Sequence, residues 1–272
     1  MRSRGRDAPP TGWADALAAF SGQALAVADA ELHKLFRDPT ELFTRSVQPI
    51  LWLLVFGQVF SRTRAIPTGG LDYLDFMAPG VLAQSILFTS IFFGIAIIWE
   101  RDLGILQKTL VSPAYRGALV LGKGLSAGAR ALAQSSLVVV VALALGVRLR
   151  AEPLRWAGVL VAVLVGAAAF STFSLVVACL VKTRERFMGI GQVLTMPLFF
   201  ASNAIYPIEL MPAWLRVVAR LNPLTYLVDG LRALMIQGAG SAFGLGVDLA
   251  VQVGVLVALV ALAARLYPTV AV

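Results

Sequence analysis

Residues 99–123 read WERDLGILQKTLVSPAYRGALVLGK and form the longest polar interruption in the first half of a very apolar chain. Three charged residues at 100–102 directly follow an uncharged run, so they mark the point where the chain leaves an apolar environment. The leucines that follow recur at helical spacing, which predicts a short amphipathic helix. Ser112 and Pro113 predict its end, because proline lacks an N–H donor and restricts the residue before it. A short helix with polar ends and one apolar side, placed between two apolar runs, is shaped to dock on another protein.

The composition around this stretch is that of an integral membrane protein. Hydrophobic residues make up 58% of the 272 residues and charged residues only 14%, with a mean hydropathy of +0.81; a soluble domain has about 25% charged residues. The net charge of +8 could indicate nucleic-acid binding, but the charges lie in short loops between apolar runs. That placement fits anionic lipid instead. We therefore expect membrane lipid, and no nucleic acid, among the partners.

Uncharged runs predict six membrane-spanning helices. The runs are residues 46–61, 76–99, 131–147, 156–181, 187–208 and 249–264. A spanning helix needs about 17 to 25 residues, so the first and last runs depend on their flanking residues to complete the span. Pro49 lies near the start of the first run, where proline costs least. The fifth run contains two prolines and Asn203, so we expect it to be kinked or to end early.

The remaining segments complete an all-α integral membrane fold. Residues 1–12 are expected to form a flexible leader, and residues 13–37 an amphipathic helix that lies on the membrane surface. Residues 38–272 would form one six-span transmembrane domain. Between the fifth and last spans, residues 214–220 predict a short amphipathic helix. Short helices that dip into the outer membrane face are expected there.

The distribution of basic residues predicts the orientation. If the N-terminus is inside, 15 of the 23 Lys and Arg residues lie on the inner side and 8 on the outer side. The positive-inside bias therefore predicts a multi-pass protein of the plasma (inner) membrane with both termini in the cytoplasm. Residues 99–123 would then face the cytoplasm, where an ATPase could reach them.

Two motifs carry a resemblance to a known family. The pattern ERDxGxLxxxLVSP at residues 100–113 resembles the cytoplasmic coupling segment of type-two ABC exporter permeases, particularly daunorubicin-resistance-like drug and lipid exporters. The run LNPLTYLVDGLR at residues 221–232 resembles the late NPxxY motif of the same family. The two motifs occur in the expected order, and the resemblance covers essentially the whole chain.

The resemblance implies an exporter subunit. This chain would be the membrane permease of an ATP-driven ABC exporter that moves an amphiphilic drug-like or lipid-like substrate out of the cytoplasm or the inner leaflet. Its implied partners are two copies of a nucleotide-binding ATPase subunit, which would hold ATP and Mg²⁺, and a second permease subunit, expected to be a copy of this chain. This chain would itself carry no catalytic residue, cofactor or metal.

The resemblance also assigns residues to three sites. The ATPase-coupling site would comprise Glu100, Arg101, Asp102, Gly104, Leu106, Ser112 and Pro113. The substrate pathway, a cleft between two permeases lined by the second and fifth spans, would include Phe88, Phe92, Met196, Phe199, Phe200 and Asn203. The outer-face motif would comprise Asn222, Pro223, Tyr226, Asp229 and Arg232. Capping and turn chemistry explains this motif well, and ordinary packing or lipid contact explains the pathway residues equally well.

Two other motif matches are rejected. Residues 117–124 nearly match GxxxxGK[ST], but Gly124 replaces the hydroxyl residue that would hold magnesium. Residues 124–128 match GxSxG, but the only histidine, His33, lies in the distant first helix. Glycines at 124 and 128 more simply allow two helices to approach closely.

The six runs contain no Asp, Glu, Lys or Arg. The predicted interior therefore offers only neutral polar groups and apolar surface, whereas ion-coupled transporters keep ionisable groups at membrane depth. Energy would have to arrive from outside the spans, although a passive scaffold would show the same pattern. Two alternatives stay open: a permease for a glycolipid or polysaccharide, and a non-transporting membrane scaffold or intramembrane enzyme.

Overall fold

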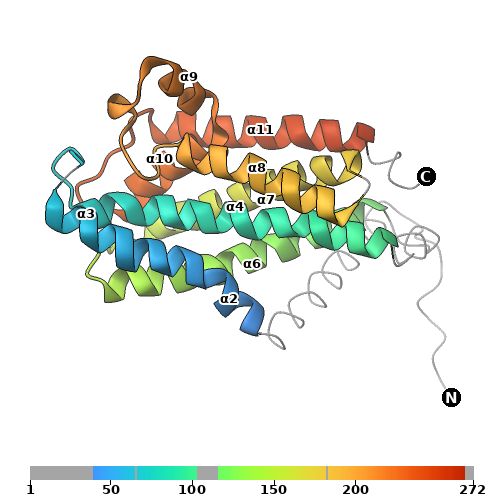
Figure 1. Ribbon diagram of the computed structural model, residues 1–272, viewed down its shortest axis with the longest axis horizontal. Coiled ribbons are helices and arrows are strands. Elements are labelled where there is room, and N and C mark those ends of the chain that lie inside the picture. Colours follow the sequence, from blue (N-terminus) through green and yellow to red (C-terminus); the bar gives the residue numbers. More distant parts are fainter. Residues whose placement is uncertain (1–38, 65, 103–115, 182, 267–272) are drawn as a thin grey trace.

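The structure is a computed structural model that describes residues 39–64, 66–102, 116–181 and 183–266, and these residues are mostly helical. Long helical segments run back and forth along one axis (Figure 1). They are α2 (Pro39–Leu51) continued by η1 (Trp52–Gly57) and α3 (Gln58–Thr63), then α4 (Tyr73–Asp102), α6 (Arg116–Ala144), α7 (Pro153–Leu180), α8 (Arg184–Phe200) and α11 (Leu245–Leu266). Shorter elements are η2 (Ile208–Leu210), α9 (Ala213–Leu221) and α10 (Pro223–Met235). We call the end at which α4, α7 and α11 begin the motif end.

Four of the described helices are long and apolar enough to cross a membrane. They are represented by Tyr73–Ala96, Ala127–Ala144, Pro153–Leu180 and Leu245–Leu266, which overlap the second, third, fourth and last predicted runs. The other two predicted runs fall on α2–η1–α3 and on α8. Their helical elements contain 13, 6, 6 and 17 residues, so each is short for a span taken alone.

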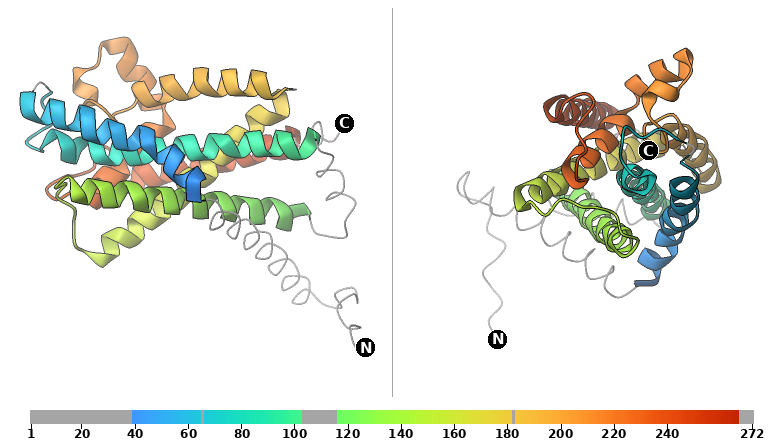
Figure 2. Two further views of the ribbon diagram at one scale, coloured as in Figure 1. Left: turned by 60° about the horizontal axis from the view of Figure 1, so that its bottom comes forward. Right: turned by 90° about the vertical axis from the view of Figure 1, so that its left-hand side faces the viewer.

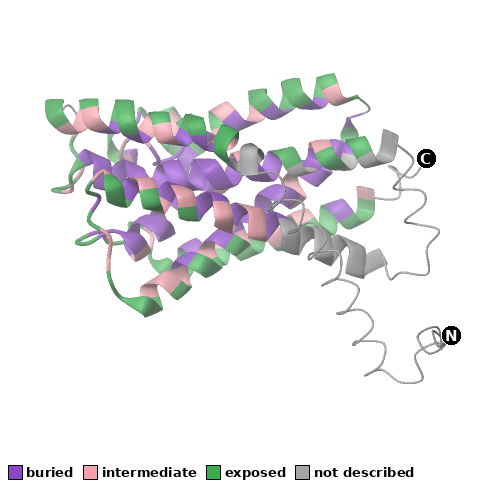
Figure 3. Ribbon diagram, turned by 90° about the horizontal axis from the view of Figure 1, so that it is seen from below, coloured by how far each residue is buried: buried purple, intermediate pink, exposed green. Residues whose placement is uncertain are grey.

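Helix α4 lies in the middle of the bundle. A view along the long axis shows it surrounded by the other helices (Figure 2), and buried residues concentrate along the centre of the bundle (Figure 3). Its first half, residues 73–87, is buried on every side, as expected for a helix in the middle of a bundle. Helix α10 packs against α4, α7 and α11 and contributes Leu224, Leu227 and Leu231 to the same core. This placement puts the late motif against the central helix.

Glycines set how closely these helices approach, and they provide a matched pair of variants. A Cβ at Gly80 of α4 would lie 2.5 Å from the backbone oxygen of Ala204, whereas one at Gly166 of α7 would meet only the end of the Leu227 side chain, at 2.8 Å. Backbone cannot move aside as a side-chain end can. We expect Gly80→Ala to lower the free energy of unfolding by about 2 kcal/mol through overpacking. We expect Gly166→Ala to be nearly neutral, because its smaller clash is offset by the better helix propensity of alanine.

Reversible unfolding in mixed micelles, followed by tryptophan fluorescence, measures both variants. Equal losses of stability at Gly80 and Gly166 would contradict the packing described here.

Local structure differs from the sequence predictions in the first run. Helix α2 begins at Pro39, so Pro49 lies inside a helix, and the prediction that it lies near a helix start is wrong. The π-helix Trp52–Gly57 follows directly. Proline removes one backbone hydrogen bond, and a π-helix shifts the register of those that follow.

The other local predictions agree with the structure. Helix α8 ends early, at Phe200, with Pro197 inside it, and the helix predicted at 214–220 is α9. Gly128 lies against Leu164 of α7, as expected for close helix contact. The predicted leader and surface helix, residues 1–37, lie outside the described residues.

Candidate functional site

The late motif begins α10. The side-chain oxygen of Asn222 accepts a hydrogen bond from the Leu224 N–H at 3.0 Å, which caps the helix, and its amide Nδ2 donates to the Leu198 carbonyl at 2.6 Å. Pro223 occupies the first turn, where a missing N–H costs nothing. Asn222 therefore both starts α10 and ties it to α8.

Tyr226 and Asp229 bind the segments on either side of α10. The Tyr226 hydroxyl donates to the Arg220 carbonyl at 2.7 Å, near the end of α9. The Asp229 carboxylate accepts from the Ala242 N–H at 2.8 Å, from the Phe243 N–H at 3.2 Å, and from the Ser241 hydroxyl at 2.8 Å. This carboxylate fixes the loop that leads into α11.

Arg232 joins α10 to the central helix. Its Nε and Nη2 both donate to the Phe76 carbonyl at 3.2 Å, and Nη2 also donates to the Asn203 carbonyl at 2.7 Å. The guanidinium lies 3.8 Å from the centre of the Phe76 ring, a cation–π contact. Burial lowers the pKa of Arg232 to about 10, so the group stays charged at neutral pH. We call Asn222, Tyr226, Asp229 and Arg232 the motif clasp; it joins α4, α8, α9, α10 and the loop before α11.

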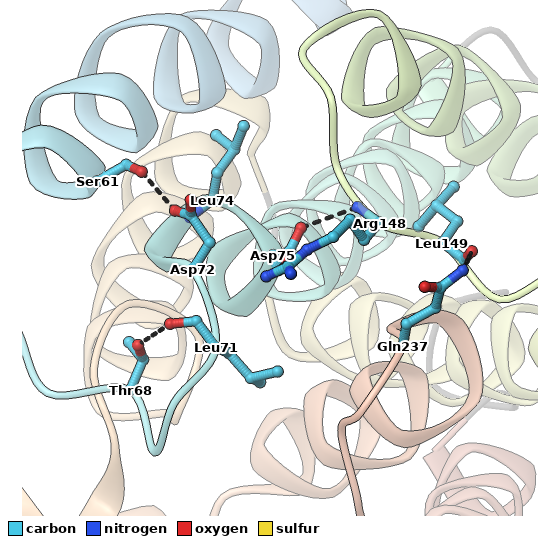
Figure 4. A network of polar contacts seen from close by, with 9 residues as sticks. All are labelled: Ser61, Thr68, Leu71, Asp72, Leu74, Asp75, Arg148, Leu149 and Gln237. Atoms are coloured by element: carbon cyan, nitrogen blue, oxygen red, sulfur yellow. Dashed lines mark hydrogen bonds and ion pairs between the residues drawn. The ribbon is translucent and has the colours of Figure 1, made fainter.

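A second polar network lies at the motif end (Figure 4). The buried carboxylate of Asp75 lies 2.8 Å from Nη2 of Arg148 and accepts hydrogen bonds from its Nε and backbone N–H, each at 2.9 Å. Gln237 donates to the Leu149 carbonyl at 2.8 Å, so the chain after α10 is fastened to the same loop. These contacts close the turn between α6 and α7 onto α4.

Asp72 precedes α4 and supports its start. The carboxylate accepts hydrogen bonds from the Ser61 hydroxyl and from the Leu74 N–H, the latter at 3.2 Å. The hydrogen bond from Ser61 lowers the pKa of Asp72 below its ordinary value, so it is ionised at neutral pH. A negative charge at a helix N-terminus is favourable.

The prediction that the interior offers only neutral polar groups is wrong at the motif end. Asp75, Asp229, Arg232 and Asp248 are all buried there. Asp75 and Asp248 each stand immediately before an uncharged run. Helices α4 and α11 begin a few residues earlier than those runs and therefore include the two aspartates, whereas α10 lies outside the runs altogether. The sequence shows that Asp75 and Asp248 lie next to uncharged runs, but it does not show that their side chains are buried.

The predicted pathway residues separate into three groups by exposure. Phe199 and Asn203 are buried within this chain, at 1% and 3% exposure, so they do not line an open surface. Phe92 and Phe200 are exposed, and Phe88 and Met196 are half-buried. Arg45 lies with its guanidinium 4.2 Å from the centre of the Phe92 ring.

Sequence reasoning missed the aromatic partner of Phe199 and Phe200. The Trp52 ring lies 5.7 Å from Phe199 and 6.1 Å from Phe200, in edge-on contacts. From Trp52 the ring contacts continue toward the motif end through Phe56, Phe60, Tyr73 and Phe76. We call these rings the aromatic row; it runs along η1 and α3 to the ring beneath Arg232.

Asn203 instead lines a pocket of about 520 Å³ at the motif end. Phe76, Asp229, Arg232 and the loops after α3 and α8 form its other walls. The side-chain oxygen of Asn203 is buried without a hydrogen-bond partner. Two residues of the motif clasp, Asp229 and Arg232, contribute charged groups to this pocket.

The coupling residues lie mostly beyond the described part of the chain. Glu100, Arg101 and Asp102 form the last residues of α4, while Gly104, Leu106, Ser112 and Pro113 lie outside the described residues. Close to this end of α4, the guanidinium of Arg184 lies 3.9 Å from the centre of the Trp99 ring, which brings the start of α8 next to it. Among the described residues, no group of three or more His, Cys, Asp or Glu could hold a metal ion.

Comparison with known proteins identifies a family and several relatives of this chain. The sequence model of the ABC-2 type transporter family matches residues 22–236. The chain is 30% identical over 207 residues to the transport permease ycf38 of Cyanophora paradoxa, which covers 74% of this chain and 70% of that protein. It is 25% identical over 229 residues to the daunorubicin resistance ABC transporter permease protein DrrB1 of Streptomyces coeruleorubidus, covering 84% and 80%. Nodulation protein J of Rhizobium leguminosarum bv. trifolii is 29% identical over 175 residues, covering 62% and 64%.

Proposed function

The chain belongs to the ABC-2 type transporter family, and from this premise we propose that it is the membrane permease subunit of an ATP-driven exporter of amphiphilic, drug-like or lipid-like molecules. Two copies of a separate ATPase subunit would supply the energy, and a second copy of this chain would complete the pathway. The observation that carries the substrate class is the aromatic row, together with exposed Phe92 and Phe200. Aromatic surface accommodates bulky amphiphiles, and a relative is named for daunorubicin resistance.

Six membrane crossings follow from the same proposal. Residues 39–63 are continuously helical, and at a rise of 1.5 Å per residue they reach beyond the roughly 30 Å of a bilayer core. Helix α8 is shorter, with 17 residues, and the buried turn at 201–204 continues it toward the motif end. The motif end would face outward and the other end the cytoplasm, in keeping with the distribution of basic residues.

The exposed faces of α2–η1–α3 and α8 are the proposed contact with the second permease. These elements flank the central α4. Their exposed large apolar side chains include Phe43, Val47, Leu51, Val55, Phe56 and Val59 on one side and Met188, Ile190, Val193 and Phe200 on the other. A second copy placed here would cover the exposed part of the aromatic row, at Trp52, Phe56 and Phe60.

Co-purification with candidate ABC ATPase subunits from the same organism tests the proposal. We expect a stable complex in nanodiscs, and ATP hydrolysis that increases when amphiphilic amines or polyketide-like drugs are added. A well-folded chain that binds no ATPase would contradict the exporter function. Chemical turnover by the purified chain without an ATPase would instead favour an intramembrane enzyme.

A further inference from the structure

Helices α7, α10 and α11 enclose an apolar groove of about 400 Å³ at the motif end. The three helices pack against one another. Leu154, Ala157 and Val161 of α7 form one wall, and Leu245 and Leu249 of α11 form the other. Gly158 and Gly230 also line the groove. The residues that line it include none from α2, η1, α4 or α8 among those described, so the groove is separate from the aromatic row.

Besides Tyr226, whose hydroxyl donates to the Arg220 carbonyl, two polar side chains interrupt this apolar lining. Asp248 and Gln252 are both only 3% exposed and both line the groove. They are four residues apart on α11 and therefore share one face of the helix. Oδ1 of Asp248 and Oε1 of Gln252 are buried with no hydrogen-bond partner. Leaving a buried acceptor unpaired is unfavourable by roughly 1–3 kcal/mol per group.

Within the fold, each of these two side chains has a hydrogen-bond partner for only one of its two polar atoms. Oδ2 of Asp248 lies 2.8 Å from the Ser241 hydroxyl, and the Gln252 amide donates to the Pro223 carbonyl at 2.5 Å. The same Ser241 hydroxyl lies 2.8 Å from Asp229, and its single proton can serve only one of the two carboxylates. None of the described residues that line the groove is a lysine or an arginine. The groove wall is therefore short of donors and of positive charge.

We infer that this groove binds an amphiphile with a protonated primary amine, whose apolar body lies between α7 and α11 and whose ammonium group faces Asp248 and Gln252. An ammonium group offers three donors and no acceptor, so one group can serve both oxygens. The last side-chain torsion of Asp248 has a broad energy profile, so the carboxylate can rotate to present an oxygen to the ammonium group. A carboxylate or phosphate head group would meet acceptors and negative charge instead.

This site does not depend on the proposed export function. Binding needs only this chain in a membrane, and it is measured without an ATPase. If the chain binds the amine but no ATPase, the exporter proposal fails and the amine site remains supported. If it binds an ATPase but not the amine, the amine site fails and the exporter proposal remains supported.

Photo-crosslinking of the full chain in nanodiscs tests the site. The probe is dodecylamine that carries a diazirine in its alkyl chain, and labelled peptides are mapped by mass spectrometry. We expect labels on the lining residues of α7 and α11, removed by excess dodecylamine and not by dodecanoic acid. Asp248→Asn keeps the size of the side chain and its contact with Ser241 but removes the charge; it should weaken labelling at least about tenfold, the loss expected for one charge-assisted hydrogen bond.

A matched pair of lipid-facing variants separates binding from folding. Ala157→Phe fills the groove and should abolish labelling. Val257 is exposed on α11 outside the groove, so Val257→Phe should leave labelling unchanged. Equal competition by dodecanoic acid, or undiminished labelling of either Asp248→Asn or Ala157→Phe, would overturn the inference.

Discussion

Replacing Arg232 by methionine is expected to lower the free energy of unfolding by about 3 kcal/mol or more, the largest loss for any single side chain of the motif clasp. Methionine fills a similar volume but cannot donate hydrogen bonds. The Phe76 and Asn203 carbonyls, which both accept from the guanidinium, would be left buried and unpaired, at roughly 1–3 kcal/mol each. The cation–π contact with Phe76 would also be lost.

Two control variants make this measurement specific. Arg232→Lys keeps the charge without the planar fork, so an intermediate loss is expected. Arg220→Met removes an exposed arginine of α9 and should change stability by less than about 0.5 kcal/mol. Unfolding in mixed micelles reports all three. If Arg232→Met were as stable as the wild type, the motif clasp would not be a structural device.

The double variant Glu100→Ala, Leu106→Asp is expected to reduce ATP-driven transport at least about a hundredfold, while the permease itself stays folded. Under the proposed function, residues 100–113, from the charged end of α4 onward, dock into a cleft of the ATPase. An aspartate on the predicted apolar side of this segment would be buried without a partner, which costs several kcal/mol, and about 2.8 kcal/mol already corresponds to a hundredfold change.

Transport into proteoliposomes and pull-down of the ATPase measure this effect together. Arg155→Gln provides the control, because Arg155 lies at the motif end, in an exposed ion pair with Glu152. If the double variant still couples ATP hydrolysis to transport, residues 100–113 do not take part in coupling.

Membership of the transporter family and the helical fold were both predictable from the sequence. A long uncharged segment in a chain of this composition has to be a helix, because only a helix satisfies its own backbone hydrogen bonds in a bilayer. The run 156–181 became α7, Pro153–Leu180, and the run 249–264 became α11, Leu245–Leu266. Capping and turn chemistry was likewise expected at the Asn-Pro pair, and Asn222 is the cap of α10. These features depend on neighbouring residues alone.

The burial of particular side chains was decided only by the tertiary structure. Phe199 and Phe200 are adjacent in sequence, yet the first is buried against Trp52 and the second is exposed. Asp75 meets Arg148, and Arg232 meets Phe76, over separations of 73 and 156 residues. A membrane helix that is apolar on every side carries no periodicity to reveal its rotation. Which face turns inward, and which charges converge at the motif end, are therefore set by the packing of all the helices together.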